Sequence, residues 1–399
     1  MRAIVVGAGI AGLVAARQLG LAGWEVDVVE RSQAPRPDGY MMDFFGPGYA
    51  AADTIGLLPR LLETAYRVDS ADYIDSEGRT TARFGYEQFA RIAGGKLLSL
   101  LRPDVELACV AALDDVPSGR VRLHYGATPV RIWADDGGPG VEFSTSRNGQ
   151  QAKMTLEADL LVGADGIHSA VRAAIFGAEE QFLRPLGMRT AAYIVRDPDL
   201  GERFEGRFIL TDTIDRQVGL YTLRDGRTAA FLVYRDSDGA AANGTRQRLQ
   251  DTFAGIGPIG EGLLELCPED PYDDVVAQVA MPQWHKGRAV LIGDACQAVS
   301  LLAGQGASLA VAGAALLADV LQPLPEGASS REIEAALDDY QQQWRPIVEE
   351  TQAVGRRAAS SFLPASRIQL LARRWTLRLS GLPGIDRILA RQIVGRLVK

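Results

Sequence analysis

The sequence predicts an α/β fold, in which a parallel sheet with covering helices is interrupted by an antiparallel sheet and followed by C-terminal helices. An apolar run at residues 3–6 leads into a glycine-rich turn and a helical pattern. A second strand-like stretch, at 287–292 and apolar from Ala289 onward, likewise precedes glycines and a long apolar helix. Between these runs, residues 177–285 carry aromatic and β-branched stretches of the kind that form strands.

The composition of the 399-residue chain is that of an ordinary globular protein, with 47% hydrophobic and 23% charged residues. The net charge of −8 argues against nucleic-acid binding, because phosphate contacts need a basic surface, and favours small-molecule chemistry. The three cysteines are too few for a disulfide framework, and the three histidines lack the spacing of metal ligands. We therefore predict a cytoplasmic protein, monomeric or homodimeric, without a bound metal.

The amino-terminal motif joins an apolar strand to a helix, and the next strand ends at Glu30. The motif reads Gly7-Ala8-Gly9-Ile10-Ala11-Gly12. In such motifs the first glycine allows the tight turn, the second lets a pyrophosphate approach the backbone, and the third lets helix and strand pack closely. The acid after the second strand accepts the ribose hydroxyls, so this segment predicts a dinucleotide site. Arg31 is interpreted either as a contact for the 2′-phosphate of NADP or as an ordinary solvated arginine.

Residues 32–49 are enriched in Pro, Gly, Met and aromatic side chains, which predicts a loop that reaches over a ligand. Arg36 and Asp43 are its notable polar members. Each is interpreted either as a cofactor contact or as an ordinary loop residue. The helical periodicity of residues 49–65 ends this loop.

A second helical pattern is predicted over residues 96–113, where Arg102 precedes a proline and so suits a first-turn position. Arg102 is a candidate contact for the middle of the cofactor. The strand predicted over 121–133 contains a further candidate contact, Val130. Two later strands joined through Asn148-Gly149 complete what we expect to be an antiparallel appendage.

Two later strands end in an acid. Residues 160–164 lead to Asp165-Gly166, and residues 287–292 lead to Gly293-Asp294, with Gly304-Gln305-Gly306-Ala307 opening the next helix. A carboxylate at a strand's end can accept sugar hydroxyls, and a glycine turn lets a flat ring lie against the N–H groups of a helix start. Taken alone, the second segment is equally typical of an ordinary α/β core.

The inserted stretch 177–285 is predicted to be a substrate-binding domain built on an antiparallel sheet. Apolar and aromatic residues on one face of this sheet are candidates for the wall of a pocket that takes a flat substrate, with plain core packing as the alternative. These candidates are Tyr193, Phe208, Leu210, Tyr221 and Phe231.

The uncharged run 295–318 is long enough to span a bilayer, but its glycine interruption and missing basic flanks favour a buried helix. A helix is predicted over 331–359, followed by a basic tail that we interpret as packing on an acidic body rather than lying on a membrane. The resulting division of the chain assigns 1–176 and 286–325 to the cofactor domain, 177–285 to the substrate domain and 326–399 to a C-terminal helical segment.

Together the three glycine- and acid-containing motifs resemble the single-component FAD-dependent aromatic monooxygenases, the para-hydroxybenzoate hydroxylase-like family, and its tetracycline-inactivating branch in particular. The resemblance implies a Rossmann-like FAD-binding domain, with the ADP half on the first motif, the FAD chain on Asp294 and the isoalloxazine beside Gly304–Gly306. It also implies that Asp165-Gly166 serves both FAD and a transient nicotinamide cofactor. The chain departs from the family pattern at Cys296, Gln297, Ser300, Leu301 and Ser308.

The reaction that this resemblance implies needs no catalytic residue from the protein. NAD(P)H reduces the flavin, O2 adds to give a C4a-hydroperoxide, and one oxygen atom passes to an aromatic or polycyclic small molecule. The expected tasks of the protein are orientation, exclusion of water and stabilisation of negative charge by the helix that begins near Gly306.

Three other functions remain open on the same fold. A flavin-dependent halogenase usually carries a Trp-x-Trp-x-x-Pro segment, and the five tryptophans here include no such pair. An epoxidase would share the flavin chemistry. A non-catalytic binder of a hydrophobic metabolite is disfavoured by the intact glycines and acids of every cofactor motif.

Overall fold

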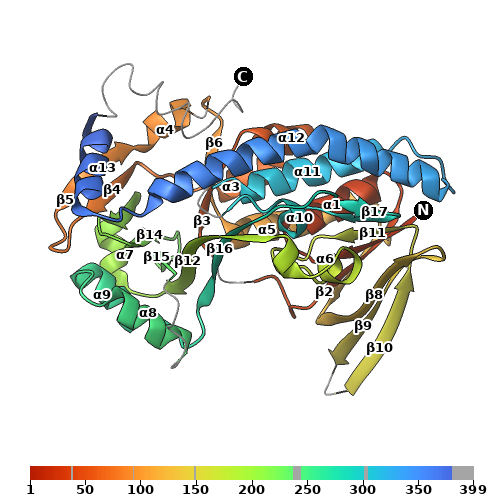
Figure 1. The fold of residues 1–399 in the computed structure, drawn as a ribbon, viewed down its shortest axis with the longest axis horizontal. Coiled ribbons are helices and arrows are strands. Elements are labelled where there is room, and N and C mark those ends of the chain that lie inside the picture. Colours follow the sequence, from red (N-terminus) through yellow and green to blue (C-terminus); the bar gives the residue numbers. More distant parts are fainter. Residues whose placement is uncertain (37–38, 93, 148–149, 237–243, 301–303, 380–399) are drawn as a thin grey trace.

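The computed structural model describes residues 1–36, 39–92, 94–147, 150–236, 244–300 and 304–379. Its two main sheets lie toward opposite ends of the long axis, and the helix α12 (Ser330–Phe362) runs along one side of the molecule past both (Figure 1). The largest apolar core surrounds the first sheet, and a second core lies beneath the other.

The first sheet is parallel except at one edge, as the fully apolar runs predicted. Its strands, in spatial order, are β17 (His285–Lys286), β18 (Ala289–Leu291), β11 (Leu160–Gly163), β1 (Arg2–Val6), β2 (Glu25–Glu30) and β7 (Val121–Tyr125). One expectation was wrong: β7 pairs in parallel with β2 and belongs to this sheet, not to the antiparallel appendage. The chain turns at Gly126, whose φ is +65°, before the appendage begins.

The helices on this sheet include the two that the glycine motifs open, α1 (Ile10–Leu21) and α11 (Gly306–Leu321), which pack on one another. α11 is buried along most of its length because α1, α2 (Pro47–Thr54) and α12 pack around it, so the part of the apolar run from 306 to 318 is a core helix. A capping box between Ser329 and Glu332 fixes the start of α12. Among the described helices, none combines the length and the apolar character needed to cross a membrane.

The second sheet has the spatial order β16 (Tyr272–Val279), β12 (Leu183–Val195), β15 (Thr228–Arg235), β14 (Arg216–Thr222), β13 (Arg207–Thr211), β4 (Ser70–Ile74) and β5 (Thr80–Gly85). Packed against one face are α8 (Thr245–Phe253) and α9 (Pro258–Glu265), whose apolar residues join its core, and α7 (Pro198–Phe204) lies beside β13 and β14. Because β4 and β5 precede residue 176, this sheet is not built from the insertion alone. The boundaries of the domains stay a prediction.

A two-stranded ribbon of β3 (Met41–Phe45) and β6 (Leu97–Leu101) connects the two sheets in the chain. The sequence analysis was wrong at both strands. It predicted a loop at 32–49, where β3 lies, and a helix over 96–113, where β6 lies. An apolar run as short as that of β6 has no periodicity that separates strand from helix, and pairing with β3 decides the matter. The predicted helix at Arg102 then follows as α5 (Arg102–Ala111).

The remaining elements follow the expected order. The predicted helix at 49–65 is divided into α2 (Pro47–Thr54) and α3 (Leu58–Thr64) by Gly56, whose φ is +71°. The appendage is β8 (Ala127–Asp135), β9 (Gly138–Arg147) and β10 (Gln150–Glu157), and the turn predicted at Asn148-Gly149 lies outside the described residues. Short helices complete the chain: α4 (Tyr86–Ile92), η1 (Ala112–Asp115), α6 (Ala170–Ile175), η2 (Glu179–Gln181), α10 (Asp294–Gln297) and α13 (Arg367–Leu379).

The basic C-terminal helix α13 is tied to the body of the protein by an acid. Arg373 donates to Asp212 over 2.6 Å, and Arg374 pairs with the other oxygen of the same carboxylate. The side chain of Asp212 is 1% exposed, so this is a buried anchor and not a loose surface pair. Two of the basic residues of the tail thus pack on an acid of the body, as predicted.

We predict that Gly12→Ala lowers the free energy of unfolding of the ligand-free protein by about 1–3 kcal/mol. A Cβ at Gly12 would lie 1.9 Å from the carbonyl oxygen of Gly7, a clash with backbone that outweighs the gain of about 1 kcal/mol that alanine brings to a helix interior. The matched control is Gly9→Ala, whose Cβ would meet nothing within 4 Å and should cost less than about 1 kcal/mol. Urea denaturation measures both, and equal losses would contradict the packing role of Gly12.

Candidate cofactor and substrate site

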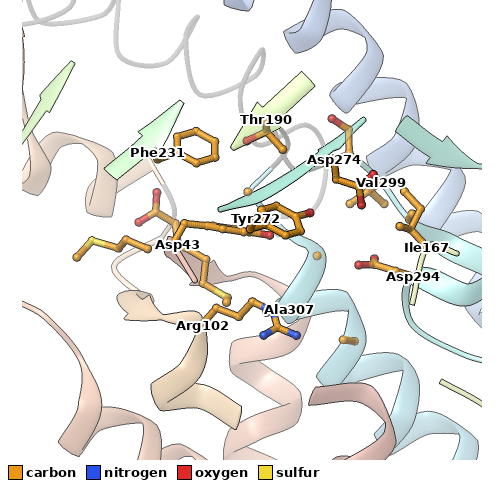
Figure 2. A pocket seen from close by; sticks show the side chains of 18 of the residues that line it. Asp43, Arg102, Ile167, Thr190, Phe231, Tyr272, Asp274, Asp294, Val299 and Ala307 are labelled. Atoms are coloured by element: carbon orange, nitrogen blue, oxygen red, sulfur yellow. The ribbon is translucent and has the colours of Figure 1, made fainter. Parts of the chain in front are cut away.

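Two connected chambers lie where the sheets meet. The outer chamber, of about 540 Å³, runs past the first glycine motif, Glu30 and Asp165. The inner chamber, of about 370 Å³, reaches the second sheet (Figure 2). Residues common to both walls include Gly9, Arg102, Gly166, Tyr272 and Asp294. The two chambers therefore form one elongated site.

The turn between β1 and α1 aims unpaired backbone donors at this site. Gly7 has a φ of +105°, and a Cβ there would lie 2.4 Å from the carbonyl oxygen of Ala164 on the neighbouring strand's end. Gly9 is the N-cap residue of α1 and no side chain caps the helix, so the first N–H groups are left for a ligand. Ile10 and Ala11 of this first turn line the inner chamber.

Glu30 lies at the outer end, at the carboxyl end of β2. Its two carboxylate oxygens accept hydrogen bonds from the backbone N–H groups of Ala8 and Ser32, each over 2.8 Å. These bonds hold the carboxylate in the wall of the outer chamber, where Arg31 and Arg36 also lie.

The appendage contributes to the outer chamber through a different residue from the one expected. Val130 lines neither chamber, and its side chain is 54% exposed. Its neighbour Pro129 lines the outer chamber instead. Successive residues of a strand point to opposite faces, so a shift of one residue reverses the direction of the side chain.

Asp294 is the central acid of the site. It begins α10 directly after Gly293, whose φ of +58° makes the turn out of β18. Its carboxylate faces both chambers and has no hydrogen-bond partner among the described residues. Burial raises the pKa of Asp294, while the positive charge of Arg102 opposes that rise. Arg102 itself is held by Glu106 over 3.2 Å.

The start of α11 forms another part of the inner wall. Gly304, at a φ of +64°, and Gly306 and Ala307 line the chamber, whereas Gln305 is buried as the N-cap residue and does not. Among the described residues no side chain caps α11, so its positive end is available to stabilise negative charge.

The departures from the family pattern have local structural roles. The side-chain oxygen of Gln297 accepts a 2.6 Å hydrogen bond from Trp344 and so joins α10 to α12. Ser308 accepts from the N–H of Gly48 over 2.9 Å, at a point where a Cβ on Gly48 would lie 2.4 Å from the backbone of Ser308. Ser300 lines the inner chamber, the buried thiol of Cys296 donates to the carbonyl of Leu291 over 3.1 Å, and Leu301 lies outside the described residues.

Asp165 shapes the loop in which it lies. It accepts hydrogen bonds from the hydroxyl of Ser169 and, over 3.1 Å, from the N–H of Val171, and burial raises its pKa. Ser169 in turn caps α6. The loop between them presents Gly166 to both chambers.

His168, in the same loop, was not singled out from the sequence. Its Nδ1 lies 3.0 Å from Glu179 and its Nε2 lies 3.0 Å from Asp274 on β16, so it links the Asp-Gly loop to the second sheet. Burial lowers the pKa of His168, but the hydrogen bonds and charges of Asp274 and Glu179 outweigh it, and the net shift is upward. Within the described ranges no cluster of His, Cys, Asp and Glu side chains could hold a metal ion.

Four of the five predicted pocket residues line the inner chamber: Phe208, Leu210, Tyr221 and Phe231. Tyr193 was placed wrongly. It donates a 3.1 Å hydrogen bond to the carbonyl of Leu263 and packs in the core on the opposite face of the sheet. Thr190, three residues earlier on β12, lines the chamber, as the alternation of a strand requires.

Several wall residues were not among the predicted pocket residues. Gln217, Tyr272 and Asp274 belong to the predicted insertion, whereas Tyr40, Met41, Met42, Tyr73 and Phe362 come from segments outside it. Phe362, for example, ends α12, more than a hundred residues after the last predicted pocket residue. No signal in the sequence brings these segments together, because the sheet pairing and the path of α12 place them.

The comparison with protein families gives a match to the FAD binding domain over residues 1–354. The chain belongs to this FAD-binding family. A relative in Mycobacterium tuberculosis, an uncharacterized protein, is 33% identical over 363 residues, with 86% of this chain and 87% of the relative covered. A flavin-dependent monooxygenase of Legionella longbeachae is 28% identical over 375 residues, with 91% and 90% covered.

Solved structures agree. The tetracycline destructase Tet(55) is 26% identical and superimposes with a TM-score of 0.76, covering 98% of this chain and 97% of its own. Klebsiella pneumoniae HpxO, solved with FAD and uric acid, shares the fold with a TM-score of 0.74 at 22% identity, covering 99% and 97%. These findings confirm the predicted resemblance, and the protein is an FAD-dependent monooxygenase of the aromatic hydroxylase type.

The site fits FAD. The start of α1, which no side chain of the described residues caps, lies where the two chambers join and suits the pyrophosphate, and Glu30 in the outer chamber suits a ribose. The central carboxylate of Asp294 is an acceptor that lacks a donor among the described residues. Arg102 and the uncapped end of α11 border the region where the flat ring would lie. The residues in these positions are those expected to hold FAD, although their individual contacts stay predictions.

We predict that Asp294→Asn weakens FAD binding by about one to two decades, because a charged acceptor in a desolvated site contributes about 1.5–3 kcal/mol. The matched control is Asp319→Asn, which removes an exposed acid of α11 that lines neither chamber. Fluorescence titration of the flavin-free proteins measures both affinities. Full affinity in Asp294→Asn would rule out this role.

A second prediction concerns the pH dependence of stability. Because the pKa of His168 is raised in the folded protein, its stabilising effect is complete below the ordinary histidine value of 6.5 and is lost as pH rises through the folded value. The difference in melting temperature between wild type and His168→Gln should therefore be larger at about pH 5.5 than at about pH 9. Thermal denaturation at both pH values gives the comparison, and a deficit independent of pH would refute it.

Proposed function

We propose that this protein hydroxylates a planar aromatic or polycyclic small molecule, using NAD(P)H and O2. The observation that carries the proposal is the junction of the two chambers at Asp294 and the start of α11, which sets an aromatic-walled cavity directly beside the flavin site. When bound, FAD supplies the redox chemistry, by taking a hydride from NAD(P)H and activating O2 at its carbon C4a.

The chain's own residues bind, orient and exclude water. The first turn of α1, Glu30 and Asp294 hold the cofactor along its length, and the close approach of Gly7 to Ala164, directly after β11, fixes the turn from which α1 begins. Rings of the second sheet, such as Phe208 and Tyr221 at 5.6 Å, give the substrate an apolar wall. The uncapped start of α11 stabilises negative charge that develops on the flat ring.

A single dinucleotide motif is present in the sequence, so we place the nicotinamide cofactor transiently at the Asp-Gly loop. Gly166, Ile167 and His168 of this loop line the outer chamber, where a second nucleotide could approach the flavin. Relatives named as flavin-dependent monooxygenases and a tetracycline destructase support a flat, multi-ring or aromatic substrate.

The cellular setting and assembly are part of the same proposal. All three cysteines are buried and free, which supports a reducing compartment such as the cytoplasm. We propose that the protein acts there as a monomer or homodimer.

The reaction is tested with isotopically labelled oxygen. NAD(P)H oxidation by the FAD-loaded protein should be slow alone, accelerate when a planar phenolic or polycyclic compound is added, and give a product heavier by one oxygen atom that comes from O2. Mass spectrometry after reactions in labelled O2 and in labelled water distinguishes the sources. Oxygen from water, or a product that is only dehydrogenated or halogenated, would overturn the hydroxylase proposal without affecting the FAD fold.

A further inference from the structure

The inner chamber holds an acid that has no cationic partner among the described residues. Asp43, in the middle of β3, points into the cavity (Figure 2). Its Oδ1 accepts a 3.0 Å hydrogen bond from the hydroxyl of Ser99 on β6 and another from the hydroxyl of Tyr86 at the start of α4. Its Oδ2 has no hydrogen-bond partner among the described residues. Two donors thus orient the carboxyl and leave one oxygen for a ligand.

The charges around Asp43 make this arrangement unusual. Of the described residues that line the inner chamber, the charged ones are Asp43, Arg102, Asp274 and Asp294, three acids and one base. Arg102 is paired with Glu106 over 3.2 Å, and Asp274 is paired with His168 over 3.0 Å. No basic side chain of the described residues pairs with Asp43, so no protein cation compensates its burial.

Burial without a cation is energetically costly for a carboxylate. Burial raises the pKa of Asp43, although the hydrogen bonds from Tyr86 and Ser99 oppose the rise. A positively charged group of a ligand would remove this cost by supplying the missing partner. A negatively charged ligand would add to it, because it would place like charges together in a desolvated site.

The walls around Asp43 suit a flat ring that carries such a cation. Tyr40 and Phe231 lie with ring centroids 5.6 Å apart, and aromatic faces attract cations as well as rings. Thr190 is 2% exposed, lines the same chamber, and its hydroxyl has no hydrogen-bond partner among the described residues. A buried hydroxyl that lacks a hydrogen-bond partner among the described residues offers the ligand a second polar contact.

We propose that Asp43 anchors a positively charged group of the substrate, and that the substrate is a planar aromatic compound bearing a protonated amine. The inference rests on the proposed function, because it assigns a substrate class to the same chamber. The ammonium pairs with the free oxygen of Asp43, the ring packs against the aromatic side chains of the chamber wall, and anionic aromatic acids are rejected. Asp43 acts here as a binding residue and takes no part in oxygen transfer.

Binding of three matched naphthalene probes to the FAD-loaded, oxidised protein tests the inference without turnover. The probes are 2-naphthylmethylamine, 2-naphthalenemethanol and 2-naphthoic acid, which differ in charge on one ring system. Perturbation of the flavin absorbance reports binding. We expect the amine to bind about tenfold or more tighter than the alcohol, and the acid to bind most weakly. Tightest binding of the acid, or equal binding of amine and alcohol, would overturn the proposal.

Two variants localise the effect. Asp43→Asn should abolish the preference for the amine and leave the affinity for the alcohol within about twofold of wild type, since only the charged contact is removed. Ser99→Ala removes one orienting hydrogen bond but keeps the charge, so the preference should persist in it. A salt test covers the case in which Asp43→Asn does not retain FAD. The preference of the wild-type protein for the amine should persist at 1 M salt, because a desolvated ion pair is poorly screened. Loss of this preference at 1 M salt would refute the buried contact.

The outcome is separable from that of the oxygen-labelling experiment. Oxidised protein binds the probes in the absence of NAD(P)H, so a preference for the amine would stand even if the enzyme transferred no oxygen from O2. Conversely, incorporation of labelled oxygen into a neutral or anionic substrate, without discrimination among the probes, would sustain the proposed function and refute the role of Asp43.

Discussion

The close approach of the first turn to the parallel sheet is the constraint on which the rest of the site depends. A side chain at Gly7 would strike the end of β11, and one at Gly12 would strike the carbonyl of Gly7. Without these contacts α1 could not begin where it does, and the residues of its first turn would not line the inner chamber. Glu30 reinforces the turn because its carboxylate accepts from the N–H of Ala8. The residues that pack the turn and those that face the ligand are therefore different members of one motif.

A second constraint joins the flavin site to the substrate chamber. The ribbon of β3 and β6 carries Asp43 and Ser99, and α5 begins with Arg102 directly after β6. Pairing of β3 with β6 thus brings the candidate cofactor contact Arg102 and the chamber acid Asp43 into one part of the fold, although they are far apart in the chain. His168 adds a link across the junction, because it joins the Asp-Gly loop to Asp274 of the second sheet. Two sheets with separate cores are in this way held around one elongated cavity.

The prediction of the fold from sequence succeeded where a segment carries its own signal. Strands β1, β11 and β18 are short apolar runs buried on both faces, and the glycines that follow them are local requirements of the backbone. The errors at β6 and β7 have a common cause. Each was assigned from its sequence neighbours, to a helix and to an appendage, whereas pairing with a distant strand determined its structure. The predicted direction of the Tyr193 side chain was wrong for a related reason, since the register of a strand decides which face of the sheet each side chain occupies.

The sequence by itself determined the parallel sheet, the two glycine-opened helices and the acids Glu30, Asp165 and Asp294, because these depend on residues that are close together in the chain. Only the tertiary structure decided which side chains meet in the inner chamber. Asp43, Thr190, Tyr272 and Phe362 come from four separate elements, and no local pattern distinguishes them from loop or core residues. The absence of a basic partner for Asp43 among the described residues is a property of the assembled cavity. The nature of the cofactor is thus encoded in short motifs, whereas the charge that the substrate meets results from the packing of distant segments.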